Sequence, residues 1–173
     1  MWRGETGMIG LAKGLDIINA TRRNHALEHA TVTVLLERFG FTRSLAGRSN
    51  QRGFNIFGNV STQELRSAVD EGLARLRSGE SSLAVSPFCG TNIAVTGMLA
   101  GLTTLALVGR NNRAQQLPNV MVGGMIAVLL GQPIGRLVQK YLTTSPDMSS
   151  MQVRSVTAKG WGPFKAHWVE TVQ

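Results

Sequence analysis

Two histidines and a glutamate stand close together in the first third of the chain, as His25-Ala-Leu-Glu28-His29. Residues three and four apart on an α-helix share a face, so the two imidazoles can reach one metal ion with the carboxylate beside it. This H-x-x-E-H order is the inverse of a common zinc-peptidase pattern. In that chemistry zinc activates a water and the glutamate takes its proton, which leads to amide hydrolysis. The pattern predicts zinc ligands at His25 and His29 and a general base at Glu28.

The same residues have a plain structural alternative. The chain has three histidines, and histidines one helical turn apart often serve packing or hydrogen bonding. In that interpretation His25 belongs to the first turn of a helix and Glu28 pairs with Arg22 or Arg23.

A catalytic zinc normally has a third protein ligand. Peptidases with inverted motifs use a distant glutamate, but the corresponding stretch of this chain is apolar and holds no carboxylate. Cys89 is the first candidate, because it is the single cysteine and precedes the apolar stretch; its alternative is a small interfacial apolar residue. His167 is the second candidate, or else a surface histidine on a strand. The remaining substitutes are acids: Glu64, Asp70, Glu71 and Glu170.

Two long apolar stretches follow Cys89. Between Ser81 and Gly135 only Arg110 and Arg113 are charged. The spans 92–109 and 119–138 have about 18 to 20 residues each, which matches a bilayer core of roughly 30 Å. We therefore predict a transmembrane hairpin over 90–145. Gly97/Gly101 and Gly131/Gly135 stand four residues apart, a spacing that favours close helix packing in lipid.

The rest of the chain predicts a small α+β domain, of about four strands and two to three helices, that the hairpin interrupts. Helices are expected over 5–20, 23–39 and 62–78, with Gly40 ending the second and Ser61 and Glu64 forming a capping box on the third. Strands are expected at 53–58, 83–86, 151–158 and 165–172, the last two joined by a hairpin turn at 159–164. Residues 41–52 are expected to form a loop.

These elements give three predicted regions. Residues 1–20 form an amphipathic N-terminal helix, which either lies along the bilayer surface or docks on the domain. Residues 21–89 and 146–173 form the discontinuous α+β domain, and residues 90–145 form the hairpin.

The formal net charge of +8 indicates an anionic partner. Beside a membrane hairpin, anionic lipid headgroups are the expected one, and without a recognition-helix or basic-aromatic pattern nucleic acid is not. Lys13 and Asp16 interrupt the N-terminal apolar run, so no secretory signal is expected. We expect a bacterial inner membrane with the α+β domain in the cytoplasm.

Three stretches resemble a bacterial membrane-protein family described only as a domain of unknown function and met in phototrophic bacteria. They are Arg23–Thr31, the stretch from Leu45-Ala-Gly47 to Arg52-Gly-Phe54, and Cys89-Gly-Thr-Asn92. The resemblance spans roughly residues 20 to 140 and implies that the hairpin and the histidine motif belong together. It also implies a histidine near position 86 in other members, where this chain has Ser86.

Two functional hypotheses follow from the sequence. The first is a membrane-anchored zinc-binding protein of metallopeptidase-like type that acts near the membrane surface. The second is a non-enzymatic accessory or assembly subunit of a larger membrane complex, such as a photosynthetic one, joined to other subunits or to its own copies through the Gly-rich spans. A transporter is not expected, because neither span has an ionisable residue at mid-depth.

Overall fold

The computed structural model describes residues 5–42, 44–108, 113–160 and 165–173. They form an α+β structure with four α-helices and a four-stranded antiparallel sheet. The chain divides into two compact units: residues 1–85 with 143–173, here the α+β unit, and residues 86–142, here the hairpin unit. The elements are α1 (Glu5–Phe39), η1 (Gly40–Thr42), β1 (Ala46–Asn50), β2 (Gly53–Phe57), α2 (Thr62–Arg77), η2 (Ser81–Ala84), α3 (Gly90–Leu107), α4 (Arg113–Val138), η3 (Gln139–Thr143), β3 (Gln152–Lys159) and β4 (Ala166–Val172).

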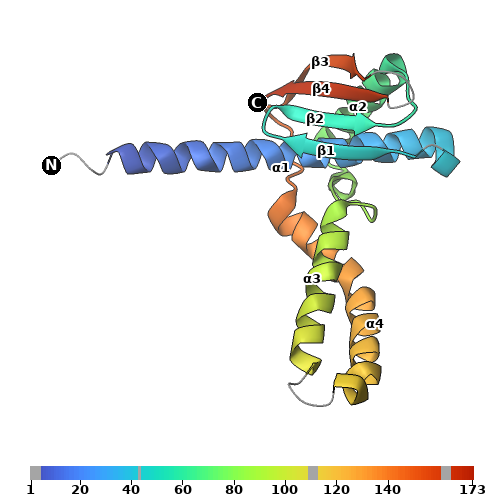
Figure 1. Ribbon diagram of the computed structural model, residues 1–173. Coiled ribbons are helices and arrows are strands. Elements are labelled where there is room, and N and C mark those ends of the chain that lie inside the picture. Colours follow the sequence, from blue (N-terminus) through green and yellow to red (C-terminus); the bar gives the residue numbers. More distant parts are fainter. Residues whose placement is uncertain (1–4, 43, 109–112, 161–164) are drawn as a thin grey trace. The chain divides into compact units, whose positions relative to one another are not determined.

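The sheet of the α+β unit has the strand order β1-β2-β4-β3, with every neighbouring pair antiparallel (Figure 1). Helix α1 packs against β1 and β2, and α2 packs against α1 and β3. Apolar side chains at alternate positions, Phe54 and Ile56 on β2 and Val169 on β4, enter the core between the sheet and the helices. The core thereby holds the middle of α1 against the sheet.

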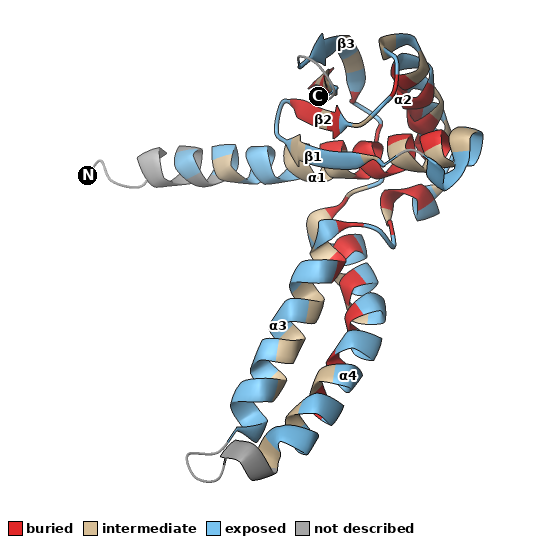
Figure 2. Ribbon diagram, turned by 45° about the vertical axis from the view of Figure 1, so that its right-hand side comes forward, coloured by how far each residue is buried: buried red, intermediate tan, exposed pale blue. Residues whose placement is uncertain are grey.

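Helix α1 is one continuous helix, so the prediction of separate helices over 5–20 and 23–39 is wrong. Residues 20–23 contain neither Gly nor Pro, so nothing there interrupts the helix. It ends at Phe39, and Gly40 takes a left-handed φ of 64°, as expected of a helix stop. Figure 2 shows buried residues in the part of α1 that crosses the sheet, whereas Leu15, Ile17 and Ile18 are about half exposed.

Two other local predictions are also wrong. Residues 46–50 form the edge strand β1 and not a loop, because pairing with β2 overrides the weak strand preference of Ala-Gly-Arg-Ser-Asn. Residues 81–84 form the 3-10 turn η2 and not part of a strand. Leu83 and Ala84 are buried in the core there, and burial rather than sheet pairing explains their apolar character.

The remaining elements of the α+β unit agree with their predictions. Helix α2 begins with the expected capping box: Ser61 Oγ accepts from the Glu64 amide, and the Glu64 carboxylate accepts from the Ser61 amide. Strands β2, β3 and β4 lie where strands were expected. The predicted turn at 159–164 falls largely outside the described residues.

In the hairpin unit, α3 and α4 pack along each other. A Cβ added at Gly131 would lie 3.1 Å from Thr96 Cα, and one at Gly135 would lie 3.0 Å from Asn92 Cα. These two glycines therefore allow the close approach that their spacing predicted. Gly97 and Gly101 are exposed and have no neighbouring atoms in reach of a Cβ, so they belong to a different helix face.

Both hairpin helices are long and apolar enough to cross a membrane, over Gly90–Leu107 and Gln116–Thr143. Only 6% and 22% of their most apolar windows are buried, so they are not core helices of the α+β unit. A buried polar cluster ties the base of this hairpin: Gln139 Nε2 donates to Asn92 Oδ1 (2.7 Å) and to Ser86 O (3.0 Å), and Gln139 Oε1 accepts from the Ser86 amide (2.8 Å). Ser86, at the position where the resemblance implies histidine, thus contacts Gln139 through its backbone.

Candidate metal centre

Helix α1 carries two neighbouring rows of polar side chains, and the second row is offset from the first by one residue along the chain. Asn24 and Glu28 form the first row, and it faces the sheet. Asn24 is fully buried; its Nδ2 donates to Asn50 O (2.8 Å), and its Oδ1 accepts from Thr171 Oγ1 (2.7 Å). Because these bonds reach both β1 and the end of β4, they set the rotation of α1 about its own axis.

Glu28 is held against strand β1. Its side chain is 6% exposed, and its Oε2 accepts a hydrogen bond from Ser49 Oγ. A Cβ at Gly47 would lie 2.7 Å from Glu28 Cγ and closer still to the carboxylate. Only glycine at position 47 leaves room for this carboxylate, which explains a glycine in the middle of an edge strand.

His25 and His29 form the second row, and each binds a backbone carbonyl through Nδ1. His25 Nδ1 lies 3.0 Å from Thr143 O, and His29 Nδ1 lies 2.9 Å from Ala84 O. A carbonyl oxygen only accepts hydrogen bonds, so Nδ1 carries the proton in the neutral ring and Nε2 carries the lone pair. Metal-ligating histidines are commonly oriented in this way, by a carbonyl on the nitrogen that does not bind the metal.

The free lone pair of His29 is buried. His29 is 4% exposed, and its Nε2 has no hydrogen-bond partner among the described residues. An unpaired buried nitrogen is costly, by about 1–3 kcal/mol. The ring centroids of His25 and His29 are 4.3 Å apart. The structure thus brings the two predicted ligands together on one face of α1.

The segment after Thr143 is fastened to the same part of α1. The Ser145 amide donates to Arg22 O (3.1 Å), Arg22 donates to Thr144 O (3.0 Å), and Arg23 pairs with Asp147 (3.1 Å). Hydrogen bonds from Ser149, together with Arg23, lower the pKa of Asp147. Asp147, rather than Glu28, is the acidic partner of Arg23.

Cys89 belongs to the hairpin unit, where it is the N-cap of α3. Its Sγ accepts from the Thr91 amide at 3.4 Å, and the thiol is buried and not in a disulfide. A helix N-terminus favours negative charge, which suits the thiolate form that binds metals.

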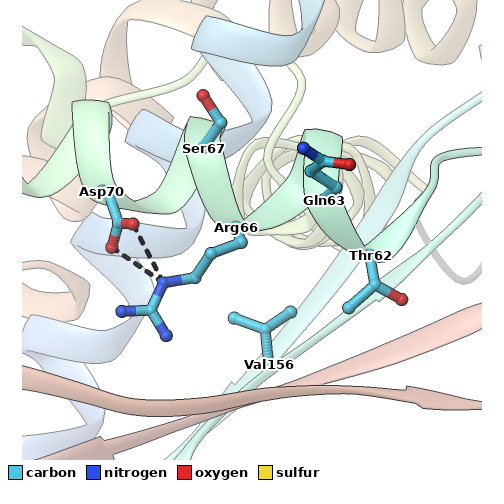
Figure 3. Close-up of a pocket in the computed structure, with 6 residues that line it drawn as sticks. All are labelled: Thr62, Gln63, Arg66, Ser67, Asp70 and Val156. Carbon is cyan, nitrogen blue, oxygen red and sulfur yellow. Dashed lines mark hydrogen bonds and ion pairs between the residues drawn. The ribbon is translucent and has the colours of Figure 1, made fainter.

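The four substitute acids all have other roles. Glu64 caps α2, Asp70 pairs with Arg66, Glu71 pairs with Arg38, and Glu170 accepts from Ser155. The Arg66–Asp70 pair lines a hollow of about 610 Å³ on α2 (Figure 3) that contains no histidine or cysteine.

His167 lies on β4, paired in register with Ile56 of β2 and Ala158 of β3. It is 3% exposed, so it is a buried histidine and not a surface one. Burial, and then the charge of Lys165, lower its pKa. His25 and His29 lie on α1, so the structure places His167 on a different element from that pair.

Four contacts of the site were not predicted from the sequence: the carbonyls of Ala84 and Thr143, the hydroxyl of Ser49, and the glycine at position 47. Every residue carries a backbone carbonyl, so residue types do not indicate which carbonyl a histidine will contact. The Gly47-Arg-Ser49 stretch could have indicated the contacts with Glu28, because residues two apart in a strand point to the same face.

Comparisons with known proteins agree with the resemblance seen in the sequence. An uncharacterized protein from the cyanobacterium Picosynechococcus is 37% identical over 142 residues, which cover 76% of this chain and 69% of that protein. No solved structure matches. The family model DUF6391, a domain of unknown function, matches residues 20–156, which include the histidine motif and the whole hairpin unit. The chain belongs to the DUF6391 family.

Proposed function

We propose that this chain is a membrane-anchored zinc-binding protein in which His25 and His29 are ligands through Nε2. The observation that carries the proposal is the pair of Nδ1–carbonyl contacts, to Thr143 and Ala84, with the buried and unpaired Nε2 of His29. Nitrogen ligands held in this way suit zinc, copper, nickel and iron. Zinc is the first choice because of the H-x-x-E-H order.

Cys89 is the proposed third ligand. It is the single cysteine of the chain, and a thiolate is one of the ligands that zinc prefers. The chain supports this choice: Cys89 stands five positions after Ala84, whose carbonyl holds His29, so the two Cα atoms can lie at most roughly 17 Å apart. Imidazole nitrogen and thiolate sulfur are both zinc ligands, and a catalytic zinc with three protein ligands leaves its fourth position to water or substrate.

Membrane anchoring by the hairpin unit is the second part of the proposal. Its support is the length, apolar composition and exposure of the two helices. Arg110 and Arg113 are the only charges between Ser81 and Gly135, and the chain as a whole carries +8. A positive protein beside a bilayer is attracted to anionic headgroups.

Elemental analysis of the full chain in detergent tests the metal site. We expect about one zinc per chain, lost when His25 and His29 are both changed to Ala and weakened by Cys89→Ser. The matched control is His167→Gln, which removes a buried histidine outside the ligand set and should keep the zinc. The proposal is overturned if wild-type protein binds no zinc after chelation and reconstitution but keeps its helical circular dichroism spectrum.

Hydrolysis is a second candidate activity, because Glu28 directly precedes His29 on α1. A zinc-bound water needs a general base, and a buried carboxylate steadied by Ser49 suits that role. The proposed substrates are peptide segments close to the membrane surface. Glu28→Gln should keep the zinc and abolish cleavage of such peptides, while unchanged cleavage would leave the chain a metal-binding protein without this activity.

An accessory or assembly subunit remains the alternative. The exposed Gly97 and Gly101 on α3 favour it, because they offer a small-residue face of the kind that helices use to associate in lipid. Native mass spectrometry distinguishes the assembly subunit from the zinc-binding protein. A metal-free chain that forms an assembly, and no longer does so after Gly97→Leu, supports the subunit. A chain that carries zinc supports the metal-binding protein.

A further inference from the structure

The N-terminal part of α1 extends beyond the sheet of the α+β unit (Figure 1). We call residues 5–19 the arm. Leu15 and Ile18 in the arm are exposed by 52% and 54%, so these apolar side chains do not dock on the α+β unit. The helix meets the end of the chain at Ala20, whose carbonyl accepts a hydrogen bond from Gln173 Nε2 (3.1 Å). The apolar side chains of the arm are therefore free to contact something outside this unit.

These apolar side chains lie on the same face of α1 as its two histidines. Steps of three and four residues lead from Leu15 to Ile18 and on to both histidines, and positions at this spacing share one face of an α-helix. Lys13 and Asp16 are out of step with this series, which places them on the opposite side at about 3.6 residues per turn. The arm is therefore amphipathic, and its apolar face continues the face that carries the imidazole rings.

This face of α1 is also where the chain leaves the α+β unit for the hairpin unit and where it returns. Ala84, one residue before the end of the first segment, contacts His29 Nδ1 through its carbonyl at 2.9 Å. Thr143, the first residue of the returning segment, contacts His25 Nδ1 through its carbonyl at 3.0 Å. Both connections to the hairpin unit therefore lie on the same side of α1 as the apolar face of the arm.

The hairpin unit carries exposed aromatic residues close to these connections. Phe88 and Tyr141 are exposed by 65% and 64%, and Lys140 Nζ lies 5.4 Å from the centre of the Tyr141 ring. Tyrosine is enriched where a spanning helix meets the headgroups, and lysine side chains reach the headgroups from there. Tyr141 stands two positions before Thr143, so their Cα atoms can lie at most about 7 Å apart. A membrane interface at Tyr141 is thus tethered close to the face of α1 that contacts Thr143.

We propose that the arm of α1 is an interfacial helix, which lies along the bilayer surface with Leu15 and Ile18 towards the acyl chains. The inference rests on the proposed membrane anchoring, because a spanning hairpin is what brings a bilayer to this face. Interfacial helices bury their apolar face by roughly 5–10 Å at the boundary between headgroups and acyl chains, and keep their polar face in water. The arm has one basic residue, Lys13, against the acids Glu5 and Asp16. Apolar burial, and not attraction to anionic lipid, therefore holds it at the surface.

Spin labels on single cysteines test the orientation of the arm, in the full chain reconstituted in neutral phosphatidylcholine nanodiscs. Cys89→Ser provides the background for each labelled variant. Collisions with oxygen, which concentrates in lipid, and with a water-soluble nickel chelate report the surroundings of each label. We expect Leu15→Cys and Ile18→Cys to shift the collision ratio towards oxygen. The matched controls on the opposite face, Lys13→Cys and Asp16→Cys, should shift it towards nickel.

A label at Leu105 distinguishes failure of this inference from failure of the membrane anchoring. Leu105 is 77% exposed on α3, so Leu105→Cys reports whether the hairpin unit lies in lipid. Lipid exposure at Leu105 together with water exposure at Leu15 and Ile18 overturns the interfacial arm and leaves the anchoring intact. Water exposure at Leu105 overturns both. Protection of Leu15 and Ile18 from both reagents assigns their face to a protein partner, such as a second copy of the chain, and also overturns the interfacial arm.

Discussion

The imidazole rings of His25 and His29 lie 4.3 Å apart between centroids and are inclined by 59° to each other. Their Nδ1 atoms hold Thr143 and Ala84, which stand at the two ends of the α+β unit where the chain enters and leaves the hairpin unit. One pair of side chains on one helix turn thus secures both chain connections.

Asn24→Ala should destabilise the α+β unit. The substitution leaves Asn50 O and Thr171 Oγ1 without their buried partner, which predicts a loss of about 2–4 kcal/mol for two hydrogen bonds. Denaturant unfolding of the full chain in detergent measures it. Asn19→Ala, an exposed site on the same helix, is the control and should change the stability little. Equal stability of the two variants would show that Asn24 does not anchor α1.

Gly47→Ala should displace Glu28. The added methyl group would overlap the carboxylate, and Glu28 is too buried to move freely, so we expect a loss of about 1–3 kcal/mol. In the control, Gly14→Ala on α1, the methyl group meets no neighbour and should stabilise the helix by up to about 1 kcal/mol. Thermal unfolding compares them. A neutral Gly47→Ala would contradict the close contact between Glu28 and β1.

Gly135→Ala should weaken the hairpin unit. A methyl group there would lie 3.0 Å from Asn92 Cα and closer to the amide oxygen that accepts from Gln139. Overpacking of this kind costs about 1–3 kcal/mol. Unfolding in increasing SDS, followed by circular dichroism, measures the loss. Gly97→Ala is the matched control on an open helix face, and similar losses in both variants would rule out the proposed packing.

The stability of the α+β unit should depend on pH through His167. Burial and the charge of Lys165 lower the folded-state pKa below the ordinary 6.5, so the unfolded chain takes up a proton first as the pH falls. The contribution of neutral His167 is complete above about pH 6.5 and is lost as the pH falls towards the folded-state pKa.

Denaturant unfolding of metal-free protein at several pH values checks this dependence. His167→Gln should show a flatter stability profile below about pH 6.5 than the wild type. Asp147 and Glu80, whose pKa values are lowered, titrate in both proteins at more acid pH and cancel in the comparison. Parallel profiles would mean that His167 does not titrate differently on folding.

Local patterns were sufficient for part of this protein. The capping box at Ser61 and Glu64, the helix stop at Gly40 and the alternation in β3 and β4 involve residues close in the chain, so their spacing predicts the structure directly. The same is true of the two apolar helices and of the shared face of His25 and His29. In each case the interaction lies within a few residues.

Tertiary contacts decided the rest. Strand β1 forms because β2 offers a partner and Gly47 leaves room for Glu28, although its own residues favour a loop. The sequence predicts a strand at Ala84, because a short apolar run looks the same whether it lies in a strand or in a buried turn. The structure places Ala84 in the core as part of a turn. The orientation of both imidazoles depends on carbonyls 55 and 118 residues away. Residue types and spacing determined which groups could bind a metal. Only the folded chain, through backbone carbonyls that every residue carries, determined that Nδ1 of each ring makes the hydrogen bond.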